Sequence, residues 1–221
     1  SGIQNIILGF IIMEFIRFID NSAGLSRMHL ISHWPLWLQA GFFVITHDFY
    51  IYWMHRWMHH NKYLWRIHEA HHSTIHVDWL SGSRSHSLEI LINQTVEFMP
   101  IILLGAAPEV AFYKGIISAI WGMWIHSNID IRNRPLQYII NGPQMHRWHH
   151  SDTAGDGKKN LTTKLAVWDW LFGTAYLPDN KKPAGYGITE VDFPKNYLKQ
   201  HIYAFRSFSG DPTFMSEEER S

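Results

Sequence analysis

A chain of 221 residues is long enough for one domain with a sizeable core, and its 19 basic and 19 acidic side chains give a formal net charge of +0, so nothing in the composition indicates nucleic-acid binding. It contains no cysteine, which excludes disulfides, iron–sulfur clusters and thiolate zinc sites. Because it contains 16 histidines, we expect any metal to be held by imidazole and carboxylate groups.

Four apolar segments predict helices that enter a membrane. Ile3–Phe18 is short for a full crossing of the hydrocarbon core, and the chain opens directly on "SGIQ", which is compatible with further sequence upstream. Trp34–Met54 is long enough to cross, and its aromatic residues gather at both ends as in interfacial belts. Leu88–Leu104 and Ala111–Ile125 predict a hairpin of two further passes that turns near Pro108.

The alternative is a soluble α-helical protein whose core contains these segments, since acidic residues such as Glu89 and Glu97 interrupt them. The positions of the histidines favour the membrane interpretation. If Trp34–Met54 runs inward, every histidine cluster lies on one side of the membrane, and the outer turn near Pro108 has none. Basic residues accumulate beside the clusters, which predicts the cytoplasmic side, although Arg17 and Arg27 count against it.

After about Asn128 no further spanning segment follows, which predicts a water-soluble cap. We therefore expect an all-α integral membrane protein of one domain, 1–221. Residues 1–128 would hold about four hydrophobic helices and the first two histidine clusters, and 129–221 would form a cytoplasmic cap with the third. In the cap, Asn141 is a plausible N-cap and Pro143 fits the first turn of a short helix.

The histidines recur at helical spacing. Three of them stand at i, i+3 and i+4 in "HEAHH", three more in "HRWHH", and two at i and i+4 in "HRWMH". On a helix each triad can point at one centre, while a break at Asn61 re-aims the second cluster relative to the first. One zinc takes about four ligands, so ten candidate imidazoles predict a dinuclear site. The ten are His55, His59, His68, His71, His72, His86, His126, His146, His149 and His150.

A zinc hydrolase is a second interpretation, because His68-Glu69-x-x-His72 satisfies H-E-x-x-H with Glu69 as the base. It leaves the other clusters without a role, and in the third cluster the equivalent residue is Arg147, which cannot act as a base. A metal carrier or storage protein is the non-enzymatic interpretation, but a carrier should place histidines along the spanning helices or on both faces.

From about Asp48 to Pro178 the chain resembles the fatty acid hydroxylase superfamily, which includes sterol desaturases. The three ordered boxes "HRWMH", "HEAHH" and "HRWHH" carry the resemblance, with "DFYIYWMHR", "GSRSHSLEI" and "AVWDWLFGTAYLP" around them. It implies that the box histidines bind metal, that His126 is a further ligand, and that His86 is either a ligand or a hydrogen-bond donor to one. It also implies two iron ions, Fe2+/Fe3+, at the cytoplasmic interface.

The resemblance implies hydroxylation of a lipid C–H bond with dioxygen, and desaturation of a lipid or sterol remains an alternative with the same site. Zinc has no redox chemistry, although it can replace iron in purified protein. Electrons are expected from an external ferredoxin- or cytochrome-type donor, because no dinucleotide-binding glycine motif is present. Neither the lipid nor the oligomeric state follows from the sequence.

Polar side chains near the boxes are candidates for supporting the metal ligands. Asp48, Glu69 and Asn128 are the first candidates, and Glu89 and Glu97 are further carboxylates of this kind. His47 and Asp48 lie inside the second apolar segment, about two turns before the first box, where polar groups are costly and are functional by default.

Overall fold

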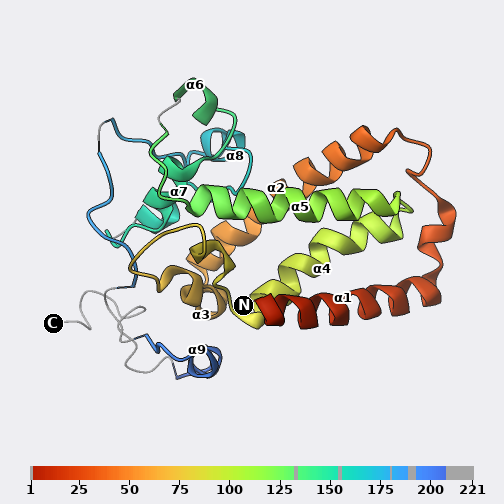
Figure 1. Cartoon of the computed structure of the whole chain (residues 1–221), viewed down its shortest axis with the longest axis horizontal. Coiled ribbons are helices and arrows are strands. Elements are labelled where there is room, and N and C mark those ends of the chain that lie inside the picture. Colours follow the sequence, from red (N-terminus) through yellow and green to blue (C-terminus); the bar gives the residue numbers. More distant parts are fainter. Residues whose placement is uncertain (1, 132–133, 154–155, 180, 189–192, 208–221) are drawn as a thin grey trace.

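Four long helices, α1 (Gly2–Ala23), α2 (Leu36–His60), α4 (Ser87–Leu103) and α5 (Pro108–His126), form one end of the molecule (Figure 1). The computed structural model describes residues 2–131, 134–153, 156–179, 181–188 and 193–207. At the other end gather α3 (Lys62–His72), α6 (Arg134–Gln137), α7 (Pro143–His149), α8 (Val167–Leu171) and α9 (Tyr197–Tyr203). The described residues contain no strand, which confirms the all-α prediction.

The break between α2 and α3 lies at Asn61, as predicted. The Asn61 backbone is extended, and its side-chain Oδ1 accepts hydrogen bonds from the amides of Tyr63 (2.9 Å) and Leu64 (3.2 Å). An asparagine in this position satisfies amides that have no partner inside the new helix. The chain therefore turns sharply after the first histidine box and presents the second box from a separate helix.

The start of α7 differs from the prediction in one residue. Pro143 occupies the first helical turn as expected, but the N-cap is Gly142, which offers no side-chain cap. The predicted cap, Asn141, is buried and donates its side-chain amide to the Thr162 carbonyl instead. The prediction of Asn141 as N-cap was wrong because a long-range hydrogen bond to the segment before α8 replaced the local one.

Helix α1 has 22 residues, so it is about 33 Å long and can cross a bilayer. The expectation that this segment is too short was wrong, because the helix extends beyond Phe18 to Ala23. Among the described helices it is the one that is long and apolar enough to do so by itself. Of the other three, α4 has only 17 residues, while α2 and α5 carry polar side chains such as Asp48 and Lys114.

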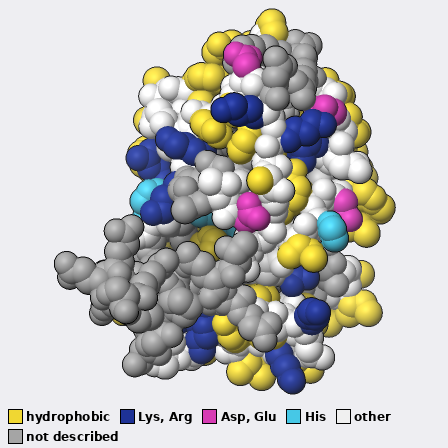
Figure 2. All heavy atoms as spheres, turned by 90° about the vertical axis from the view of Figure 1, so that its left-hand side faces the viewer, with side chains coloured by type: hydrophobic (Ala, Val, Ile, Leu, Met, Phe, Trp, Pro, Cys, Tyr) yellow, Lys and Arg dark blue, Asp and Glu magenta, His cyan; other side chains and the backbone are white. Residues whose placement is uncertain are grey.

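The long helices nevertheless expose large apolar side chains. On α1, Ile3, Phe10 and Phe18 are each more than two-thirds exposed, and Trp37 on α2 and Phe112 on α5 are similar. Apolar side chains exposed along a whole set of helices indicate an apolar environment around them. The opposite end is different: Figure 2 shows basic, acidic and histidine side chains spread over its described surface.

Candidate metal centre

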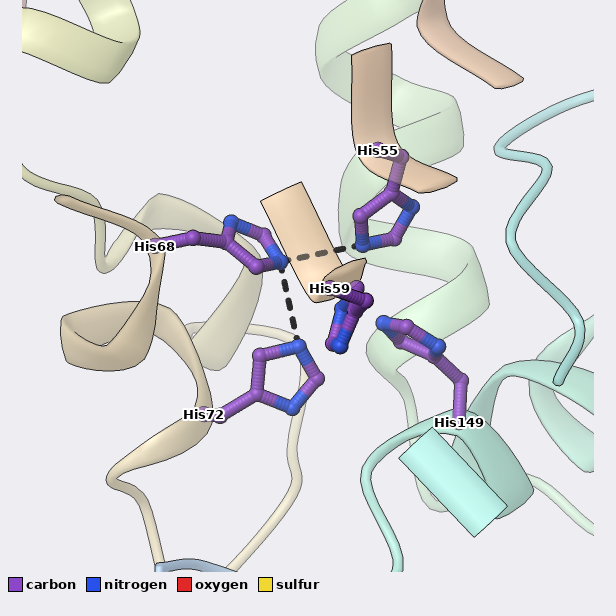
Figure 3. A group of neighbouring side chains, drawn as sticks. All are labelled: His55, His59, His68, His72 and His149. Atoms are coloured by element: carbon purple, nitrogen blue, oxygen red, sulfur yellow. Dashed lines mark hydrogen bonds between the residues drawn. The ribbon is translucent and has the colours of Figure 1, made fainter. Parts of the chain in front are cut away.

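Nine of the ten predicted histidines come together where the long helices meet α3 and α7. The first histidine group consists of His55, His59, His68, His72 and His149 (Figure 3), and the second histidine group consists of His71, His126, His146 and His150. In each group, one ring nitrogen per residue lies within 4.8 Å of the others. The groups adjoin, since the ring centroids of His72 and His150 are 4.5 Å apart.

The two triads are divided between the groups, contrary to the prediction that each points at one centre. On α3, His68 and His72 belong to the first group, whereas His71 belongs to the second. On α7 the assignment is reversed, because His146 and His150 belong to the second group and His149 to the first. Residues i and i+4 are about 40° apart around a helix, while i+3 lies about 60° to the other side of i. The i+3 histidine therefore reaches the neighbouring group.

Hydrogen bonds at Nδ1 fix the orientation of five imidazoles within the two histidine groups. A backbone carbonyl only accepts, so His55 Nδ1 must donate to Leu161 O, at 2.6 Å. His71 and His149 donate in the same way to carbonyls of other segments, and His126 donates to the Gly122 carbonyl one turn earlier on α5. His68 Nδ1 faces the buried Glu89 carboxylate at 2.9 Å. In a neutral imidazole with Nδ1 protonated, Nε2 carries a lone pair.

These lone pairs converge. The Nε2 atom of His68 lies 3.0 Å from that of His55 and 3.1 Å from Nε2 of His72 (Figure 3). In the second group the Nε2 atoms of His126 and His71 are 3.2 Å apart. Two lone pairs at this distance repel unless a cation lies between them. The buried Nε2 atoms of His59 and His149 have no hydrogen-bond partner among the described residues, so the donor set fits metal ions.

The protonation of the groups is also suited to metal binding. Burial lowers the pKa of the His68 imidazole to about 3 and that of His71 to about 4. Both are therefore neutral near pH 7 and keep a lone pair for a metal. Nitrogen ligands of this kind suit iron, zinc, copper and nickel.

His86 lies outside both groups. Its Nδ1 accepts the Leu88 amide as the N-cap of α4, and its Nε2 donates to the carbonyl of His201 on α9, whose ring stacks on it at 4.4 Å. These contacts hold α9 against the start of α4. Its role as a metal ligand stays a prediction.

The three polar residues expected to support the ligands lie elsewhere. Asp48 accepts hydrogen bonds from Thr163 Oγ1 and from the amides of Lys164 and Leu165, each at 2.8 Å, and so joins α2 to the segment before α8. The Glu69 carboxylate, which is completely buried, is bound by both terminal nitrogens of the Arg206 guanidinium. Asn128 is exposed.

Other groups support the ligands instead. Glu89, which the sequence also indicated as a supporting carboxylate, faces His68. Four backbone carbonyls hold the other oriented rings: those of Arg84, Gly122, Lys159 and Leu161. Carbonyls leave no signal in a sequence. Asp169 was also missed, although it lies in "VWDWL". It accepts from the amides of Leu161 and Thr162, so it fixes the segment that orients His55.

A cavity of about 260 Å³ adjoins the histidines. His55, His68 and His71 lie on its wall together with His126 and His146, so both groups border it. Apolar side chains from the long helices, among them Ile51, Met54, Met58, Trp121 and Ile125, line the rest together with polar residues of α2, α4 and α5. A ligand in this cavity would lie between the long helices and would contact the histidine rings at one part of the wall.

The sequence of this chain is similar to those of several known proteins. A protein-family model described as "Fatty acid hydroxylase" matches residues 40–174, which include both histidine groups. The ornithine lipid hydroxylase OlsE of Rhizobium tropici is 34% identical over 174 residues, which cover 79% of this chain and 52% of that protein. The alkylglycerol monooxygenase of Homo sapiens is 31% identical over 64% of this chain and 31% of that protein.

Methylsterol monooxygenase 1 of Rattus norvegicus is 30% identical over 62% of this chain and 48% of that protein. The chain thus spans about half or less of the length of these curated relatives. No solved structure matches the chain.

Proposed function

The chain belongs to the fatty acid hydroxylase family, and from this premise we propose that it is a membrane-bound di-iron oxygenase that hydroxylates a C–H bond of a lipid. The observation that carries the proposal is the convergence of nine histidines into two adjoining groups on the wall of one cavity. The relatives named ornithine lipid hydroxylase, alkylglycerol monooxygenase and methylsterol monooxygenase support a lipid substrate.

Each histidine group would hold one iron ion through imidazole nitrogens. Bound iron would supply the redox chemistry with dioxygen that an unactivated C–H bond requires and that zinc lacks. The protein's part is to orient the ligands: the carbonyls of Leu161 and Arg84 hold the Nδ1–H groups of His55 and His71, so that each Nε2 faces another histidine of its own group. The electrons would come from an external ferredoxin- or cytochrome-type donor.

The cavity would position the lipid and exclude water. Its apolar wall comes from α2 and α5, whose outer faces also expose large apolar side chains. A lipid chain can therefore remain in an apolar environment on its way from a bilayer to the histidines. Exclusion of water near the metals would limit side reactions of the activated oxygen.

We propose that the long helices lie in a membrane and that the histidine end faces the cytoplasm. The exposed apolar side chains of α1, α2 and α5 support the first part. The second part is supported by basic residues beside the histidine groups, including Arg56, Lys62, Arg66 and Arg147. Topology mapping, in which single cysteines at the two ends of the long helices react with an impermeant reagent, measures how many helices cross completely.

The contacts of Glu69 weigh against the zinc hydrolase interpretation. A catalytic base must reach a metal-bound water, but both Glu69 oxygens are engaged by Arg206. Desaturation remains an alternative outcome of the same chemistry.

The experiment is incubation of the iron-loaded protein with extracted membrane lipids, a chemical reductant and isotopically labelled dioxygen. The proposal expects a lipid that gains one labelled oxygen atom only when reductant is present. A lipid that loses two hydrogens without gaining label would indicate the desaturase. Hydrolysed lipid formed without dioxygen would refute the oxygenase.

A further inference from the structure

The cavity wall carries a second polar site among the long helices. The Lys114 cluster consists of His47 on α2, Glu97 on α4, and Lys114 and Ser118 on α5. The Lys114 ammonium donates to Glu97 Oε1 at 2.5 Å and to His47 Nδ1 at 3.0 Å, and Ser118 Oγ donates to Glu97 Oε1 at 2.7 Å. His47, Glu97 and Ser118 all line the cavity that borders the histidine groups.

An ion pair in this position costs more free energy than apolar contacts between the three helices would. Lys114 is 0% exposed, and the desolvation of a buried charge often costs more than its pairing returns. Apolar side chains of similar volume would pack α2, α4 and α5 without that cost. Ionisable residues inside a set of apolar helices therefore indicate a function.

The hydrogen bonds of the cluster determine what it can offer a ligand. An ammonium group only donates, so His47 Nδ1 must accept from Lys114. In the neutral imidazole the proton then lies on Nε2, which is a donor. Nε2 is buried and makes no hydrogen bond of normal geometry to a described residue, since the Asn93 backbone interacts with the ring only weakly, and the His47 side chain borders the cavity. Such a donor lacks the acceptor that buried groups almost always have.

The Glu97 carboxylate supplies the complementary group. Among the described residues, its contacts with Lys114, Ser118 and His47 all go through Oε1. Its second oxygen can therefore accept a hydrogen bond from a ligand. A donor on His47 and an acceptor on Glu97 match a hydroxyl group, which both accepts and donates.

We infer that the Lys114 cluster binds a hydroxyl group of the lipid substrate and thereby sets which carbon reaches the histidine groups. His47 precedes His55 by eight residues on α2, so the two side chains lie about 12 Å apart along the helix axis. The oxidised carbon would then be separated from the bound hydroxyl by a chain of about that length. His47 acts as a positioning residue, and the substrate class is a long-chain lipid that bears a hydroxyl group.

This inference rests on the proposed function for the role of the cavity, but its test does not require oxidation. Binding of radiolabelled 1-hexadecanol and of hexadecane to the zinc-loaded protein in detergent is measured by filtration. The intact protein should prefer the alcohol, and His47→Phe should reduce that preference about tenfold, as expected for one lost hydrogen bond to a buried donor. His47→Gln should restore most of it, since the amide can accept from Lys114 and donate to the alcohol.

The exposed residue His60, on the same helix, provides the matched control, and His60→Phe should leave the preference unchanged. The metal content of each variant shows whether the histidine groups remain intact. An equal preference for the alcohol in the intact protein and His47→Phe, or no preference in either, would overturn the inference and assign the cluster to helix packing. If the preference behaves as expected but no lipid is oxidised by the iron-loaded protein, the subsite stands and the proposed function fails.

Discussion

His71 on α3 and His149 on α7 are exchanged between the two histidine groups. His71 lies in the second group with the i, i+4 pair of α7, and His149 lies in the first group with the i, i+4 pair of α3. The rings of His71 and His150 are 4.7 Å apart, as are those of His149 and His72. Each candidate metal site is therefore built from both helices. A displacement of either helix would disturb both sites, which makes the pair of groups one structural unit.

The exchange predicts how single substitutions affect metal content. His71→Ala removes a ligand from the second group only, and His149→Ala removes one from the first group only. Each variant should retain about one tightly bound metal per chain. It should lose most of the other metal, because the affinity of the group that lacks a ligand falls by about tenfold or more. Metal analysis of the purified proteins after dialysis measures this, with His60→Ala as the control.

The double variant of His71 and His149 should lose both metals. If instead either single substitution leaves two metals, or if both single variants lose the same one, the assignment of these residues to different groups is incorrect.

Glu69 is predicted to be structural. Glu69→Gln should keep both metals and dioxygen consumption, because its carboxylate binds Arg206 and no histidine ring. The loss of the ion pair between α3 and the segment after α9 should lower the free energy of unfolding by about 1–3 kcal/mol, and Arg206→Met should do the same. Denaturant titrations measure the stability. Abolished turnover at full metal content in Glu69→Gln would argue for a catalytic base.

Gly82 is predicted to be required for the second group. A Cβ atom at this position would lie 2.8 Å from His126 Nδ1 and 2.9 Å from the Gly122 carbonyl oxygen, which are themselves hydrogen-bonded at 2.7 Å. Gly82→Ala should therefore displace the His126 ring and weaken metal binding in that group by about tenfold. Competition with a chelator measures the affinity.

Gly115→Ala, whose Cβ would make an ordinary contact of 3.8 Å with the Phe98 ring, serves as the control. Equal metal affinity in the two alanine variants would show that the close approach of Gly82 does not matter for His126.

The buried histidines predict an acid-sensitive metal-free protein. Burial lowers the pKa of His68 to about 3 and of His71 to about 4, below the ordinary value of 6.5 that applies in the unfolded chain. Between about pH 6.5 and about pH 4 the unfolded chain thus binds more protons, and stability falls as the pH falls. Each residue contributes about 1.4 kcal/mol per pH unit in this window.

Thermal unfolding of the metal-free protein, followed by circular dichroism between about pH 7 and about pH 5, measures this slope. His71→Asn should reduce it. An unfolding temperature that does not change over this range would show that the histidines are not buried in the neutral form.

Local patterns in the sequence predicted much of the site. Spacings of three and four residues placed the boxes on helices, and Asn61 marked the break between α2 and α3 because its side chain caps the helix that follows. The number of histidines indicated two metals. His126 was recognised through the family resemblance, and the structure brings it into the second group.

Long-range geometry could not be read from the same patterns. The exchange of His71 and His149 depends on how α3 faces α7, and no local spacing specifies that. The partner of Glu69 is Arg206, which is 137 residues later. The Lys114 cluster joins three helices, and although His47 was recognised as a costly polar residue, nothing in the sequence paired it with Lys114.

The most direct test of the central claim is titration of the metal-free protein with Fe(II) under anaerobic conditions, followed by addition of a reductant and dioxygen. The dinuclear oxygenase predicts saturation at two irons per chain and dioxygen uptake that requires both iron and reductant. Saturation at one iron, or two irons with no reductant-dependent uptake, would contradict it.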